Sequence, residues 1–78
     1  MLQIRNNLAM SKFAENVRQV RDLHARIDHQ RQVIEELAGE GHDTTAARNI
    51  LDSLLISLFL YVEDRHRLNV MLNGQNVK

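Results

Sequence analysis

Four histidines are the residues of this 78-residue chain that most readily suggest chemistry: His24, His29, His42 and His66. His24 and Asp28 are four residues apart, a spacing that places two metal-ligating side chains on one face of a helix. No HExxH motif or carboxylate-rich motif accompanies them. The predicted role of the histidines is therefore structural, with no metal site and no cofactor. A bundle that binds a metal or small ligand through His24 and Asp28 is the alternative hypothesis.

A second group with catalytic residue types is the run His42-Asp43-Thr44. A nucleophilic site also needs a third group that orients the base, and the sequence indicates none nearby. The position of the run, directly after Gly41, favours a turn followed by a helix cap. The chain contains no Gly-rich phosphate loop, nucleophile elbow or nucleic-acid-binding motif. We therefore predict no catalytic residue and a protein that is not an enzyme.

The composition is typical of a small helical protein whose core needs support from outside. Hydrophobic residues make up 44% of the chain, and there is no proline and no cysteine. A chain this short buries a small fraction of its surface, and without disulfides oligomerisation is the expected support. Ten basic residues balance ten acidic ones, so no net charge attracts nucleic acid or an anionic membrane. We expect a homo-oligomer, with a dimer favoured, and no nucleic-acid or membrane partner.

The ends and the apolar runs of the chain show no targeting or spanning segment. Arg5, Asn6 and Asn7 occur where a signal peptide needs an apolar core, so the expected location is cytoplasmic. The apolar run 54–62 is shorter than the roughly 20 residues that cross a bilayer. It is interpreted as a buried part of a helix.

Apolar residues at helical spacing predict a first helix over about residues 11–38, with Ser11 as its N-cap. The predicted stripe comprises Phe13, Val17, Val20, Leu23, Ile27, Ile34 and Leu37. His24 and Arg31 are expected within this stripe. Residues 1–9 do not continue it and are expected to form a weakly ordered extension.

Two glycines predict the end of that helix and a tight turn over residues 39–43. The predicted turn and cap consist of Gly39, Gly41, His42, Asp43 and Thr44, with Gly39 in the left-handed conformation. Asp43 or Thr44 is expected to cap a second helix over about residues 44–72, followed by a frayed tail at 73–78. The stripe of this helix comprises Ala47, Ile50, Leu51, Leu54, Leu55, Leu58, Tyr61, Val62, Leu68 and Leu72.

A short turn makes the two helices antiparallel neighbours, with facing residue numbers that add to about 82. Arg65 is expected inside the stripe of the second helix, where a buried charge needs a partner. This register predicts three interhelical ion pairs: Arg31 with Asp52, Arg18 with Asp64, and Glu15 with Arg65. Their expected role is to set the register and the choice of partner.

A second apolar patch on the later helix predicts association with further helices. Ile56, Phe59 and Leu60 lie away from the main stripe, so a single hairpin would leave them in water. The predicted oligomer interface comprises Leu55, Ile56, Phe59, Leu60 and Val62. The fold class that follows is all-α: an antiparallel two-helix hairpin, or helical coiled coil, that dimerises into a four-helix bundle.

The turn and its flanking helices resemble a family of short uncharacterised helical-hairpin proteins of alphaproteobacteria. The similar positions are Ile27, Gln30, Ile34, Leu37, the turn Gly41-His42-Asp43-Thr44, Ala47, Leu51, Asp64, Arg65 and Leu68. The resemblance implies a bacterial cytoplasmic hairpin and brings no activity or site residues. The leading functional hypothesis is a homo-oligomeric adaptor or regulator that offers a helical surface to another helical protein.

Overall fold

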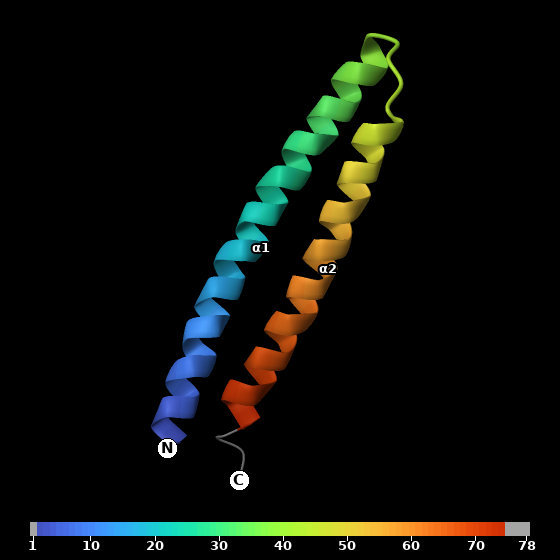
Figure 1. Cartoon of the computed structure of the whole chain (residues 1–78). Helices are drawn as coiled ribbons and strands as arrows, with labels where there is room; N and C mark the ends of the chain where they lie inside the picture. The colour runs from blue at the N-terminus through green and yellow to red at the C-terminus, as the bar shows by residue number, and fades with distance from the viewer. Residues whose placement is uncertain (1, 75–78) are drawn as a thin grey trace.

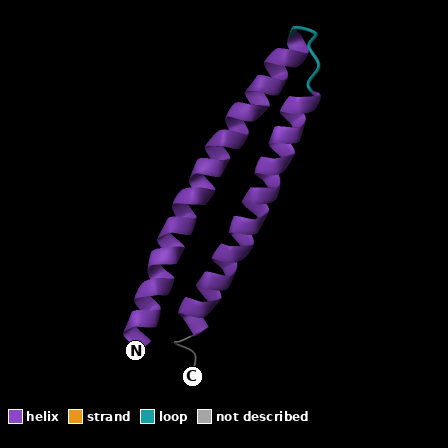
Figure 2. Ribbon diagram, viewed as in Figure 1, coloured by secondary structure: helices purple, strands orange, loops and turns teal. Residues whose placement is uncertain are grey.

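A computed structural model shows a hairpin of two long helices and describes residues 2–74, with side chains from Asn7 onward. Helix α1 spans Leu2–Gly39 and α2 spans Thr45–Gly74. The two helices lie side by side and antiparallel (Figure 1), and a single short loop joins them (Figure 2). The molecule is a rod of 59 × 16 × 14 Å. The prediction of an all-helical fold with two packed helices is confirmed.

Helix α1 begins at Leu2 rather than at the predicted Ser11. The N-cap role of Ser11 is therefore wrong, and residues 2–9 belong to the helix instead of forming a separate extension. Ala9 explains the difference, since it is 3% exposed and packs in the contact between the helices. Helix α2 likewise continues past residue 72 to Gly74, while Met1 and residues 75–78 lie outside the described part.

The contact between the helices, which we call the seam, follows one heptad pattern with alternating steps of four and three residues. In α1 the seam comprises Ala9, Phe13, Asn16, Val20, Leu23, Ile27, Gln30, Ile34 and Leu37. In α2 it comprises Ala47, Leu51, Leu54, Leu58, Tyr61, Arg65, Leu68 and Leu72. Every member is buried or half-buried except Tyr61, which is 37% exposed. The contact thus follows the heptad pattern that is typical of antiparallel coiled coils.

The seam is narrower than the predicted stripes. Val17 and Ile50, which were expected within them, are 38% and 52% exposed, and His24 and Arg31 are also exposed. Their predicted places in the stripe were wrong because a single neighbouring helix covers only the narrow row of heptad contacts. Arg65 does lie in the seam and is half-buried.

Two side-chain hydrogen bonds fix the register of the helices. Asn16 Nδ2 donates to the carbonyl oxygen of Tyr61 at 2.8 Å, and Gln30 Nε2 donates to that of Ala47 at 3.0 Å. The residue numbers 16 and 61 add to 77, as do 30 and 47. Both sums lie below the predicted value of about 82, so the contacts across the seam differ from the predicted register.

The register shift also removes the three predicted ion pairs. Within the described residues the structure holds one ion pair, between His42 Nε2 and Glu40 Oε1 at 3.5 Å, and it lies at the loop. None of the predicted pairs, Arg31 with Asp52, Arg18 with Asp64 or Glu15 with Arg65, is formed. The loop runs back beside α1, so that the end of α1 extends beyond the start of α2 (Figure 1). Arg18 and Glu15 also face away from the seam, because each follows a seam residue by two positions.

The end of α1 is closed by a Schellman motif centred on Gly41. His42 N–H donates to the carbonyl oxygen of Leu37 at 2.8 Å, and Gly41 N–H donates to that of Ala38 at 3.1 Å. Gly41 has a φ of 80°, so it takes the left-handed conformation predicted for Gly39, which remains helical. The loop can therefore leave the helix axis two residues later than expected.

Asp43 and Thr44 organise the start of α2. Asp43 Oδ1 accepts hydrogen bonds from the Thr45 hydroxyl at 2.7 Å and from its N–H at 2.9 Å. The Thr44 carbonyl accepts the first helical bond, from Arg48 N–H, at 2.8 Å, which makes Thr44 the N-cap residue. The hydrogen bonds from the Thr45 side chain and then its backbone lower the pKa of the Asp43 carboxyl from 3.8.

Candidate interaction surface

The predicted interface residues of α2 all lie at the surface of the hairpin. Their exposed fractions are Leu55 37%, Ile56 62%, Phe59 62%, Leu60 59% and Val62 39%. Full burial of a large apolar side chain stabilises a protein by about 1.5–3 kcal/mol, so the hairpin alone leaves several kcal/mol unrealised. An apolar surface of this kind marks a place where another molecule binds.

A second heptad row runs along α2 directly beside the seam. We call it the α2 outer stripe; its members each follow a seam position by one residue and are Arg48, Asp52, Leu55, Phe59, Val62 and His66. One residue corresponds to a rotation of about 100° around a helix. Helix α2 therefore carries two contact rows roughly at right angles, the first occupied by α1 and the second open. Ile56 and Leu60 lie further round the helix and do not belong to this stripe.

Helix α1 carries a matching row. The α1 outer stripe also follows the seam by one residue and comprises Met10, Ala14, Val17, Arg21, His24 and Asp28. In an antiparallel pair of helices these positions lie on the same side of the hairpin as the α2 outer stripe. Met10 is 58% exposed, so the apolar end of this row is open as well. Apolar periodicity had assigned Val17 to the core, and only the narrow seam shows its place in a second row.

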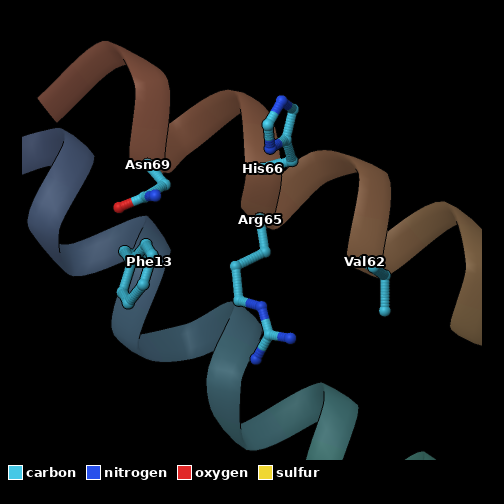
Figure 3. Close-up of a pocket in the computed structure, with 5 residues that line it drawn as sticks. All are labelled: Phe13, Val62, Arg65, His66 and Asn69. Carbon is cyan, nitrogen blue, oxygen red and sulfur yellow. The ribbon is translucent and has the colours of Figure 1, made fainter. Parts of the chain in front are cut away.

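A groove between the helices opens beside the α2 outer stripe. It has a volume of about 370 Å³ and is lined by Phe13, Val62, Arg65, His66 and Asn69. Figure 3 shows the Arg65 side chain extending from α2 towards α1, while the His66 ring points away from α1. The groove is shallow and carries one cation and one imidazole that do not converge. Its shape suits a contact with another chain better than a bound small molecule.

The geometry gives the metal alternative no support. His24 and Asp28 are both exposed on α1. Among residues 2–74, the structure contains no group of three or more His, Asp or Glu side chains close enough to hold a metal ion. A metal site on these residues would need ligands from another molecule.

The apolar character of α2 also bears on membranes. By length and composition alone, α2 is the described helix that could cross a membrane, a weak criterion that core helices and signal sequences also meet. Only 6% of the most apolar 18-residue segment of α2 is buried in the hairpin. The helix also carries three arginines and three acidic residues, so no net positive charge favours an anionic lipid surface.

The solvent-accessible surface of the chain is large for its mass. The solvent-accessible surface is 6133 Å² for a mass of 9.1 kDa. A compact monomer of this mass exposes about 4,900 Å², so the hairpin exposes an excess of about 1,200 Å². A standard protein interface removes about 800 Å² from each partner. An elongated two-helix rod thus exposes more surface for its mass than a compact monomer does.

Comparison with known protein families, with curated proteins and with solved structures gives no significant match. The resemblance to the alphaproteobacterial hairpin proteins accordingly stays a prediction. What can be argued about function rests on the surface described above.

Proposed function

We propose that this protein is a non-enzymatic interaction module that works as a homo-oligomer, with a dimer of hairpins forming a four-helix bundle. The observation that carries the proposal is the exposed apolar surface of α2, with Leu55 37%, Phe59 62% and Val62 39% exposed. Covering such a surface is favourable, and a small two-helix core gains the most from it. The small size of the buried core supports the same view, since no large side chain of the described residues is less than 2% exposed.

The two contact rows of α2 explain why a bundle is the favoured assembly. Each helix of a four-helix bundle packs against two neighbours, in directions roughly at right angles. The seam of α2 already contacts α1, and the α2 outer stripe lies about 100° away. A second hairpin is thus the smallest addition that covers the open row.

Such a bundle would act as a small adaptor or regulator. The rod shape, 59 Å long, offers an extended helical surface to a helical partner protein. Ile56 and Leu60, outside both contact rows, are the residues available for that partner. The cytoplasmic location remains an expectation drawn from the sequence.

Light scattering coupled to size-exclusion chromatography tests the oligomer. The unmodified chain should elute at twice its 9.1 kDa mass at micromolar concentration. Changing Leu55, Phe59 and Val62 of the α2 outer stripe together to lysine should give a folded or partly folded monomer. A control with lysine at the exposed polar positions Asn49 and Ser53 should remain dimeric. A stable monomer of the unmodified chain would remove the proposal.

A further inference from the structure

We infer that two hairpins pair about a two-fold axis parallel to their long axis, so that the α2 outer stripe of each copy packs against the α1 outer stripe of the other. This inference rests on the proposed self-association and adds its geometry. Both outer stripes lie on one side of the hairpin, one on each helix. Rotation by half a turn about an axis beside that side brings α2 of one copy next to α1 of the other, and each contact occurs twice.

The register of this contact follows from the fold itself. Rotation about an axis parallel to the rod moves no residue along the rod. Two residues at the same height within one hairpin therefore also lie at the same height when they belong to different copies. The hydrogen-bonded pairs Asn16–Tyr61 and Gln30–Ala47 set that level at a sum of 77. Along the outer stripes, 28 and 48, 24 and 52, and 17 and 59 each add to 76. The second contact therefore reuses the spacing of the seam without any shift of the chains.

Charges on the two stripes are complementary in this register. Asp28 of one copy lies opposite Arg48 of the other, and His24 lies opposite Asp52. All four side chains are exposed in the single hairpin and none is in an ion pair within the described residues. Arg48 already uses its Nε atom to donate to the Thr44 hydroxyl at 2.9 Å, which leaves its terminal nitrogens for a carboxylate. The arrangement gives His24 and Asp28 a role in partner recognition.

Apolar groups meet at two levels of the other half of the stripes, while Arg21 lies opposite Leu55 and Met10 lies opposite His66. Val17, 38% exposed, lies opposite Phe59, and Ala14 lies opposite Val62. A small alanine and a branched valine leave room for the phenyl ring to pack against α1 of the other copy. The crossed arrangement covers apolar groups of both helices at once.

A second copy fits the stripes better than a lipid surface does. Their fixed charges are two arginines, Arg21 and Arg48, and two aspartates, Asp28 and Asp52. A surface helix on an anionic membrane needs an excess of basic residues around its apolar face.

Mixing two charge-reversed chains tests the crossed geometry. In Asp28→Arg, each homodimer sets the introduced arginine against Arg48 twice, and in Arg48→Asp each homodimer sets two aspartates together twice. Each variant alone should dimerise at least about tenfold more weakly. In their mixture, the heterodimer restores one opposite-charge contact and keeps the native one, so it should form with nearly the affinity of the unmodified protein. Sedimentation of the separate and mixed variants, one carrying a fluorophore, measures this.

Matched controls carry the same charge changes outside the stripes. Asp22→Arg in α1 and Arg67→Asp in α2 alter exposed residues that face elsewhere. Each should dimerise as the unmodified chain does, and mixing them should add nothing. Circular dichroism confirms that every variant keeps its helices before sedimentation.

The outcomes separate the two proposals. Heterodimers favoured by at least about tenfold over both variant homodimers support the crossed pairing. Stable dimers whose charge variants weaken without rescue on mixing overturn this inference and leave the self-association in place. An unmodified chain that stays monomeric overturns both, and its binding to phosphatidylglycerol vesicles would identify lipid as the occupant of the surface.

Discussion

The side-chain amide of Asn16 in α1 donates a hydrogen bond to the main-chain carbonyl of Tyr61 in α2, 45 residues away, at 2.8 Å. Asn16 is 4% exposed and lies in the middle of a heptad seam, while its Oδ1 atom has no hydrogen-bond partner among the described residues. A polar residue at a seam position specifies register at a cost in stability. Together with Gln30 bonded to Ala47, it holds the helices at two points, and a slip of either helix would break both bonds.

Replacing Asn16 by leucine should separate stability from register. The change removes a hydrogen bond worth about 1 kcal/mol and an unsatisfied oxygen, and buries an apolar side chain worth about 1.5–3 kcal/mol. The Asn16→Leu hairpin should therefore unfold at higher temperature, while spin labels at facing exposed positions of α1 and α2 show a broader distance distribution. A lower melting temperature with an unchanged, narrow distribution would contradict the role assigned to this amide.

The two loop glycines should respond to alanine in opposite directions. Gly41 has a φ of 80°, so Gly41→Ala should destabilise the hairpin by about 1–2 kcal/mol. Gly39 is the last residue of α1, and Gly39→Ala should stabilise it by about 0.5–1 kcal/mol because alanine favours the helix. An added Cβ meets no atom within 4 Å at either position, so only the backbone conformation differs. Urea unfolding measures both; equal effects would disprove the assignment of the left-handed residue.

Asp43 should make the start of α2 sensitive to acid. Hydrogen bonds from Thr45 lower the pKa of its carboxyl in the folded chain below 3.8. The ionised carboxylate therefore stabilises the fold above the unfolded-state pKa of about 4, and this contribution is lost as the pH falls through the lower folded-state pKa. The melting temperature of Asp43→Asn should lie below that of the unmodified chain at pH 7, and the difference should shrink in strong acid. A constant difference would show that the charge plays no part.

The loss of stability when an isoleucine is replaced by alanine should depend on how deeply that isoleucine is buried in the seam. Ile27 is 2% exposed at the centre of the seam, so Ile27→Ala should reduce the free energy of unfolding by about 2–4 kcal/mol. Ile50 is 52% exposed, and Ile50→Ala should cost less than about 1 kcal/mol. Chemical denaturation under identical conditions compares them. Similar costs would indicate that another contact covers Ile50 in solution.

Several parts of the structure were predictable because local chemistry controls them. Apolar spacing gave two helices, and glycines followed by Asp43 and Thr44 gave a loop and a helix start near the right place. The exposure of Phe59 and Ile56 was predictable because both residues lie off the main apolar row. The exposure of Val17 was not, since Val17 fits a wide apolar stripe as well as a second narrow row, and only the position of the seam distinguishes the two.

The register of the two helices could not be predicted from short-range sequence patterns. Ion pairs such as Arg18 with Asp64 were predicted because the residue types alone do not show the path that the loop takes between the helices. Asn16 and Gln30 were overlooked because polar residues do not contribute to an apolar pattern, although their amides bond across the seam.

The amino-acid sequence by itself determined that two amphipathic helices form, that they fold back near Gly41, and that more apolar surface exists than one hairpin can cover. These properties depend on backbone preferences and on spacing of side chains within a few residues. The tertiary structure alone decided which residues meet, because the path of residues 42–44 and two amide hydrogen bonds set how far one helix slides along the other. The narrow seam also left Val17 and His24, which had been expected within the apolar stripe, exposed in an open row.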